Sequence, residues 1–238
     1  MNLTVDAVLQ RMRATADPAR LAGMARYGID TDGRLGLKMP KLRALAKDIG
    51  RDHDLALDLW ATGIHDARIL APMLADRELA DGGLMDDWVI GFNSWDVCDQ
   101  CCINLFRRLP PAWSKIEAWA PRREEFVRRA AFALTATLAA HEKTAPDGRF
   151  PALLPLIEAH SDDNRNFVKK LVNWALRQIG KRNIFLHGRA IDTAERILAR
   201  GTPASRWIAH DALRELRHEK TRARLAEGRH RADDPIAP

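Results

Sequence analysis

Two short segments each place a tryptophan one helical turn from a charged residue. Trp95 and Asp99 are four residues apart, and Trp174 and Arg177 are three apart, so each pair shares one face of a predicted helix. Carboxylates and indole faces stabilise positive charge, and an arginine guanidinium can hold a phosphate through two hydrogen bonds. On parallel helices these residues would form an aromatic and acidic centre inside a basic rim.

Each of these side chains also has a purely structural interpretation. Trp95 and Trp174 could be core residues, and Asp96 or Asp99 could be acids that the helix dipole favours near a helix start. Arg129 could be a surface residue whose aliphatic stem packs while its charge stays in water. The residue types alone leave both interpretations open.

A cluster of three cysteines lies beside the first pair. Cys98, Cys101 and Cys102 resemble a metal or redox motif, but their spacing puts them on one side of an apolar helix, and the chain has no other cysteine. We therefore expect small buried side chains. The eight histidines show no metal-binding spacing, so the sequence predicts neither a metal nor an organic cofactor.

Apolar residues recur at intervals of three and four over residues 124–140, 164–180 and 205–216, which predicts helices there. Strand patterns are weak throughout. No apolar run is long enough for a membrane span, and the first residues lack the features of a signal peptide. We expect a cytoplasmic protein that associates with the nucleoid during its work and has no membrane partner.

The three predicted helices resemble one another. The segments that begin at Phe126, Phe167 and Trp207 align with one another at nearly equal spacing along the chain. A period of about 40 residues with two helices per unit is typical of HEAT and armadillo arrays. This predicts an all-α, HEAT-like helical-repeat solenoid with a concave basic groove, with an irregular helical bundle as the alternative. The fourth residues of the three segments are Arg129, Lys170 and His210.

Positive charge is concentrated in the later part of the 238-residue chain. The 38 Lys and Arg residues and the 32 Asp and Glu residues give a net charge of +6. Residues 1–100 have a net charge of −4, and residues 101–238 have +10. Of the 38 cations, 29 are arginine, the residue best suited to phosphate. The charge favours a nucleic-acid partner, although the arginine bias of a GC-rich genome would produce the same composition.

Five ordered blocks carry a resemblance to a known family. With them, the sequence resembles the AlkD family of bacterial alkylpurine DNA glycosylases, which have an all-helical HEAT-like fold, over most of the chain. The blocks are Met24–Tyr27, Leu35–Arg43, Ser94–Asp99, Arg128–Ala131 and Trp174–Arg177.

The resemblance implies a role for each matching residue. Asp99, Trp95 and Trp174 would line a catalytic cleft around the deoxyribose of the damaged nucleotide. Arg129 and Arg177 would contact the DNA backbone nearby. The further DNA contacts that we expect are Tyr27, Lys38, Arg43 and Lys170.

The activity that the resemblance implies is hydrolysis of the N-glycosidic bond of N3- or N7-alkylated purines in duplex DNA, a step of base excision repair, without drawing the base into a pocket. Such a base is already cationic, and its departure leaves oxocarbenium character on the sugar. Asp99 would stabilise that charge and orient water, and the two tryptophans would shield it. The expected partner is duplex DNA with alkylated bases, bound by a monomer.

Two departures from the family pattern leave other functions open. Ser94 stands where an aromatic residue is expected, and residues 28–34 are rich in Gly and Asp. A non-catalytic relative that binds DNA structures is the main alternative, and a protein-binding helical scaffold is a further one. We expect a single domain over residues 1–228 and a disordered tail over residues 229–238.

Overall fold

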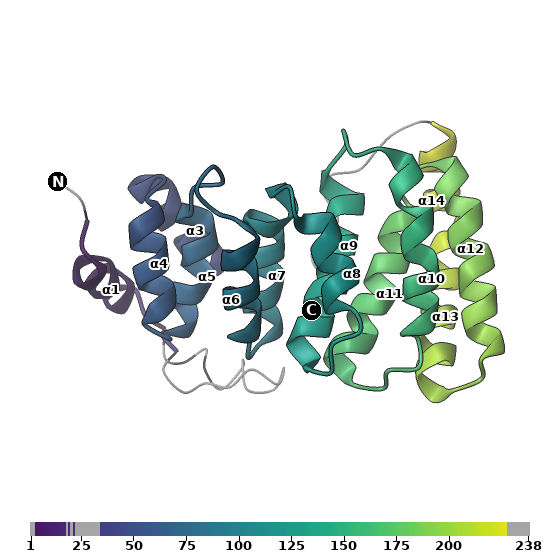
Figure 1. The fold of residues 1–238 in the computed structure, drawn as a ribbon, viewed down its shortest axis with the longest axis horizontal. Helices are drawn as coiled ribbons and strands as arrows, with labels where there is room; N and C mark the ends of the chain where they lie inside the picture. The colour runs from purple at the N-terminus through teal and green to yellow at the C-terminus, as the bar shows by residue number, and fades with distance from the viewer. Residues whose placement is uncertain (1–2, 18, 20, 22–33, 228–238) are drawn as a thin grey trace. The chain divides into compact units, whose positions relative to one another are not determined.

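A computed structural model of the chain describes residues 3–17, 19, 21 and 34–227, and all regular structure within them is helical (Figure 1). This confirms the all-α prediction. The chain divides into two compact units, Met1–Ala112 and Trp113–Pro238, and the single domain expected over residues 1–228 stays a prediction. The expected tail lies outside the described residues. None of the helices in the described ranges is long and apolar enough to cross a bilayer.

Unit 1 is built around α5, which packs against α3, α4 and α7. Its core includes Trp60 and Trp88, whose rings stack with centroids 4.4 Å apart, and Phe92 packs edge-on against Trp60. The helices of this unit within the described residues are α1 (Val5–Ala14), α3 (Met39–Ile49), α4 (His53–Ala61), α5 (His65–Leu74), α6 (Gly82–Ile90), α7 (Trp95–Asn104) and the 3₁₀-helix η2 (Phe106–Arg108).

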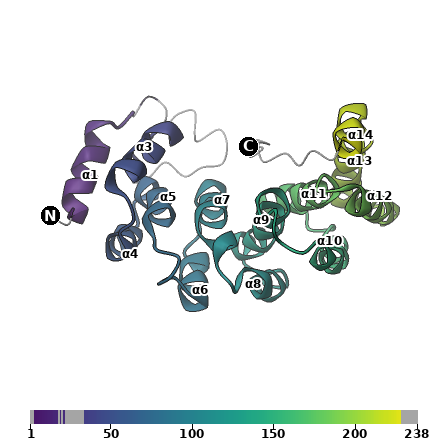
Figure 2. The same ribbon diagram turned by 90° about the horizontal axis from the view of Figure 1, so that it is seen from above.

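Unit 2 has two layers of helices (Figure 2). In one layer α9 packs against α11, and α11 packs against α13. In the other layer α10 packs against α12, and α12 also packs against α13 of the first layer. Up to residue 227, where the described part of this unit ends, its helices are α8 (Ala112–Trp119), α9 (Glu125–His141), α10 (Leu154–Ala159), α11 (Asn166–Gly180), α12 (Ile184–Ala199), α13 (Pro203–Leu216) and α14 (Glu219–Ala226), with the 3₁₀-helices η3 (Asp147–Arg149) and η4 (Pro151–Leu153).

The three long helices of one layer, α9, α11 and α13, coincide within two residues at either end with the predicted helices. Each follows a helix of the other layer, so unit 2 repeats a two-helix element at the predicted period. The rings of Phe126 and Phe167, which occupy equivalent positions, lie 5.4 Å apart. The regular interval found in the sequence is therefore a structural repeat.

Specific side chains fix how α11 and α13 approach each other and where α13 begins. Asn173 in α11 is buried and donates to the carbonyl of Ile208 in α13 at 3.1 Å. A Cβ at Gly180 would lie 2.7 Å from a methyl of Leu216, so only glycine allows the helices to pack this closely. Thr202 caps α13 by accepting from the amide of Ser205.

Candidate nucleic-acid interface

Two of the predicted catalytic residues lie on α7 in unit 1. Trp95 is the first residue of the helix, and Asp99 lies one turn later. The Trp95 side chain is half-buried, whereas Asp99 is only 1% exposed. A carboxylate that is this well shielded from water interacts more strongly with a nearby positive charge than an exposed one does.

The three cysteines of α7 are fully buried and free of disulfides, as the sequence predicted. Burial, together with the neighbouring Cys98, raises the pKa of Cys101 and of Cys102 well above the ordinary value, and the charge of Asp99 contributes to the rise at Cys102. The thiols of Cys101 and Cys102 are therefore protonated, and all three side chains pack as small apolar groups. Within the described ranges no group of three or more His, Cys, Asp or Glu residues is arranged to hold a metal ion.

The first turn of α7 is held by a charged contact that the sequence did not reveal. His65, at the start of α5, donates from Nε2 to Oδ2 of Asp96 at 2.8 Å, and Arg34 Nη1 lies 3.7 Å from the same oxygen. Burial raises the pKa of Asp96, but the hydrogen bond and charge of His65, together with Ser94 and the charge of Arg34, outweigh burial, so the pKa lies below its ordinary value. Asp96 is therefore a half-buried anion beside Trp95.

The next residue of α5 holds the segment before α3. The two carboxylate oxygens of Asp66 accept from the amides of Leu35, at 2.8 Å, and Leu37, at 2.9 Å. Consecutive residues of α5 thus anchor both this segment and α7. Sequence reasoning missed His65 and Asp66 because their partners lie several helical elements away along the chain and no local pattern marks them.

In unit 2 the predicted DNA contact Arg129 is 3% exposed. Its Nη1 donates to the carbonyl of Phe167, in the first turn of α11, at 2.8 Å. The guanidinium therefore joins α9 to α11. Its role as a backbone contact to DNA stays a prediction.

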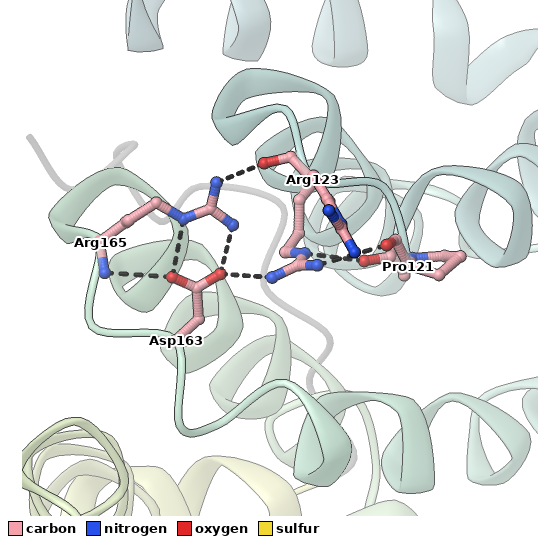
Figure 3. A network of polar contacts seen from close by, with 6 residues as sticks. Pro121, Arg123, Asp163 and Arg165 are labelled. Atoms are coloured by element: carbon pink, nitrogen blue, oxygen red, sulfur yellow. Dashed lines mark hydrogen bonds and ion pairs between the residues drawn. The ribbon is translucent and has the colours of Figure 1, made fainter.

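Asp163, in the connection before α11, holds two arginines (Figure 3). Its carboxylate accepts from Arg128 at 2.7 Å and from Arg165 at 2.6 and 2.9 Å, and Arg165 also donates to the carbonyl of Arg123. Burial raises the pKa of Asp163, but the hydrogen bonds from Arg165 and Arg128 outweigh burial and bring the pKa to about 2. Both arginines are thus committed to joining α9 and α11.

Trp174 on α11 is 5% exposed, and its indole is held by a hydrogen bond. The side-chain amide of Gln178 is oriented with its oxygen towards two donors. That oxygen accepts from Trp174 Nε1 at 2.8 Å and from Lys181 Nζ at 3.2 Å. Lys181 is itself buried and paired with Glu215 of α13 at 2.6 Å. The indole is therefore held by a residue of its own helix, and Lys181 links the same Gln178 oxygen to Glu215 of α13.

Arg177 lies one turn beyond Trp174 and pairs with the same glutamate. Its Nη1 bonds to Glu215, and its Nε lies 3.8 Å from Asp211. Burial raises the pKa of Glu215, but the charge of Arg177 and the contacts with Lys181 outweigh it and lower the pKa below its ordinary value. The Arg177 side chain remains partly exposed to solvent, so its guanidinium can still donate an N–H to a phosphate.

The remaining candidates are more accessible. Lys38 precedes α3, Arg43 lies on α3, and both are exposed; Lys170 on α11 is half-buried. These three cations form no ion pair with a carboxylate of the described residues. Tyr27 and residues 28–33 lie outside the described part of the chain. Unit 1 thus holds Trp95, Asp99, Lys38 and Arg43, and unit 2 holds Arg129, Lys170, Trp174 and Arg177.

Comparisons with known proteins identify the family and the fold of the chain. Residues 8–226 match the family described as DNA alkylation repair enzyme, and the chain belongs to this family. A solved structure with a TM-score of 0.79 and 18% identity covers 98% of this chain and 99% of its own; it is described as a member of "a new family of proteins related to the HEAT-like repeat DNA glycosylases with affinity for branched DNA structures". The HEAT-like repeat fold is thereby shown. No curated protein matches the chain.

Proposed function

We propose that this protein is a DNA glycosylase that hydrolyses the N-glycosidic bond of cationic N3- and N7-alkylated purines in duplex DNA. The observation that carries the proposal is the pairing on α7 of an indole and a shielded carboxylate, Trp95 and Asp99, in a chain of the DNA alkylation repair family. Both groups stabilise the positive charge that this bond cleavage creates.

The proposed reaction does not require protonation of the leaving base. An alkylated purine carries a positive charge and leaves as a neutral base, so the C1′–N bond breaks while positive charge builds on the sugar. A carboxylate near C1′ lowers the energy of that charge and accepts a proton from the attacking water, which then completes the hydrolysis. Asp99 is the group to which we assign this role, with Trp95 and Trp174 contributing cation–π contacts of about 0.5–2 kcal/mol each.

Contacts to the DNA backbone come from unit 2 and from α3. Lys170 and Arg177 lie one helical turn before and after Trp174, on the same face of α11, which supports a common role for the three residues. Arg129, Lys38, Arg43 and Tyr27 complete the proposed contacts. Binding of this kind depends on salt and hardly on sequence.

The test is release of methylated purines from a methylated duplex, compared with the spontaneous loss in buffer. Wild type is expected to accelerate release, and Asp99→Asn to lower the rate by about two orders of magnitude or more, in line with the loss of one electrostatic group, with little change in duplex affinity. The matched control is Asp87→Asn, which removes an exposed carboxylate of α6 without an ion pair to any described residue. Equal rates for wild type and Asp99→Asn would overturn the catalytic assignment.

The second candidate is a DNA-structure binder without glycosylase activity. It is favoured by the similarity to a protein family with affinity for branched DNA and by the engagement of Arg177 with two carboxylates. A wild-type protein that binds DNA junctions but does not accelerate release would establish this alternative.

A further inference from the structure

Helix α13 repeats the residue spacing of the candidate face of α11. Positions 167, 170, 174 and 177 are separated by three, four and three residues, so they lie on one face of α11. The same spacing from position 207 selects the equivalent face of the neighbouring helix. The four residues there, which we call the α13 surface, are Trp207, His210, Arg214 and Arg217, and all four are exposed.

Trp207 is the unusual member of this set. All seven tryptophans of the chain are described, and Trp207, with 41% exposure, is the exposed one; its equivalent on α11, Phe167, is half-buried against Phe126. A single exposed apolar side chain is common on protein surfaces. This one differs because the ammonium of Lys169 lies over its ring, 5.3 Å from the centroid.

The surroundings of Trp207 are suited to a polyanion. Lys169 and Lys170 come from α11, and Arg206 and His210 from α13; none of the four forms an ion pair with a carboxylate of the described residues. The nearest acid along the helix face is Asp211.

The acids of α13 are themselves neutralised. Asp211 pairs with Arg214 and lies 3.8 Å from Arg177, while Glu215 pairs with Lys181 and Arg177. The electrostatic field at Trp207 is therefore set by the cations Lys169, Lys170 and Arg206 of α11 and α13. An indole among cations offers a nucleic acid a stacking partner for a base and charges for the adjoining phosphates.

We propose that Trp207 is a stacking platform for an unpaired nucleobase, with Lys169 and Arg206 contacting the phosphates on either side. Bases in a duplex are already stacked on their neighbours, so such a platform recognises a single-stranded segment next to a duplex, as at an overhang, a gap or a branch. The inference rests on the proposed contact of α11 with DNA and extends it to α13.

The test compares two labelled DNAs by fluorescence anisotropy: a blunt duplex, and the same duplex with a single-stranded overhang of about ten nucleotides. Wild type is expected to bind the overhang DNA more tightly. Trp207→Ala should weaken binding of the overhang DNA by about five-fold or more, the effect of losing one base–aromatic stack, and leave blunt-duplex affinity unchanged. Trp207→Phe keeps a ring and should retain most of the preference.

The matched control is Phe185→Ala. Phe185 is 53% exposed and has Arg189 over its ring at 4.5 Å, but it lies on α12 in the other layer of unit 2. Its removal should change neither affinity. All three variants should stay folded and unfold as cooperatively as wild type, because the mutated rings lie at the surface.

Three results would overturn the inference: an unchanged overhang preference in Trp207→Ala, an equal loss on both DNAs, or no overhang preference in wild type. Base release by wild type separates this inference from the proposed activity. A wild type that prefers overhangs through Trp207 but releases no alkylated base would retain the platform and exclude the glycosylase. A wild type that releases alkylated bases but shows no preference for overhangs would retain the glycosylase and exclude the platform.

Discussion

The carboxylate of Glu215 on α13 binds Arg177 and Lys181 of unit 2 together. Arg177 is a proposed phosphate contact, so Glu215 occupies the position of an anion that DNA would supply. A phosphate that reaches Arg177 must share it with a carboxylate whose pKa is already lowered by that same arginine. This arrangement makes Glu215 an internal competitor for DNA.

Glu215→Gln should therefore strengthen binding to duplex DNA. The change releases Arg177 for a full phosphate contact, so affinity at low salt should rise several-fold, and the slope of log affinity against log salt should steepen by about one. Titrations at a series of salt concentrations measure both quantities. Glu117→Gln, at an exposed position of α8, adds the same net charge and should have little effect. Weaker binding by Glu215→Gln would instead mean that the glutamate orients Arg177.

The pair of arginines on Asp163 predicts an acid-dependent loss of stability. The pKa of Asp163 is lowered to about 2, below the value of about 3.9 for an unfolded chain. Its contribution is therefore complete above about pH 5 and is lost as the pH falls through the folded value. Asp163→Asn should lower the free energy of unfolding by about 2 kcal/mol at neutral pH.

The measurement is the difference in unfolding free energy between wild type and Asp163→Asn in denaturant at several pH values. The difference should narrow as the pH is lowered from about 5 towards about 3. Asp192→Asn, at an exposed position of α12 without an ion pair to a described residue, should match wild type at each pH. A difference that does not depend on pH would contradict the ionic origin of the stabilisation.

His65 is expected to position the first turn of α7. His65→Ala leaves the Asp96 carboxylate without its closest donor and should lower the free energy of unfolding by about 1–3 kcal/mol. Because Trp95 adjoins Asp96, the maximal rate of base release should fall as well. His65→Gln can still donate to Asp96 and should restore most of both quantities. If the glutamine variant releases bases no faster than the alanine variant, the hydrogen bond does not position α7.

The helices of unit 2 could be predicted because each buries one face. Apolar residues spaced by three and four mark α9, α11 and α13, and the regular spacing of Phe126, Phe167 and Trp207 marks the repeat. Both patterns can be read from the sequence, because the apolar spacing lies within one helix and the repeat recurs at a regular interval. The three repeat segments also have Arg129, Lys170 and His210 at equivalent positions, but their environments differ, because Arg129 is buried and His210 is exposed.

The partners of the charged side chains could not be predicted. Arg129 reaches a backbone carbonyl of the next repeat, and Asp96 is held by His65, which lies two helices earlier in the chain. Helical periodicity gives the face on which a residue lies but not the atom that its long side chain reaches. The basic excess of the later half likewise overstates the free charge, because Arg128, Arg165 and Arg177 are paired with carboxylates.

The ion pairs of unit 2 also constrain how the array can change in length. Several of them join residues separated by 35 to 38 positions, close to one repeat; examples are Arg128 with Asp163, Arg177 with Glu215, Arg196 with Glu158 and Arg200 with Asp162. In a one-dimensional array of this kind each repeat depends on its immediate neighbours. Excision of one internal repeat would separate arginines on one side from their carboxylates on the other, so a change in the number of repeats leaves these charges unmatched unless the neighbouring repeats change with it.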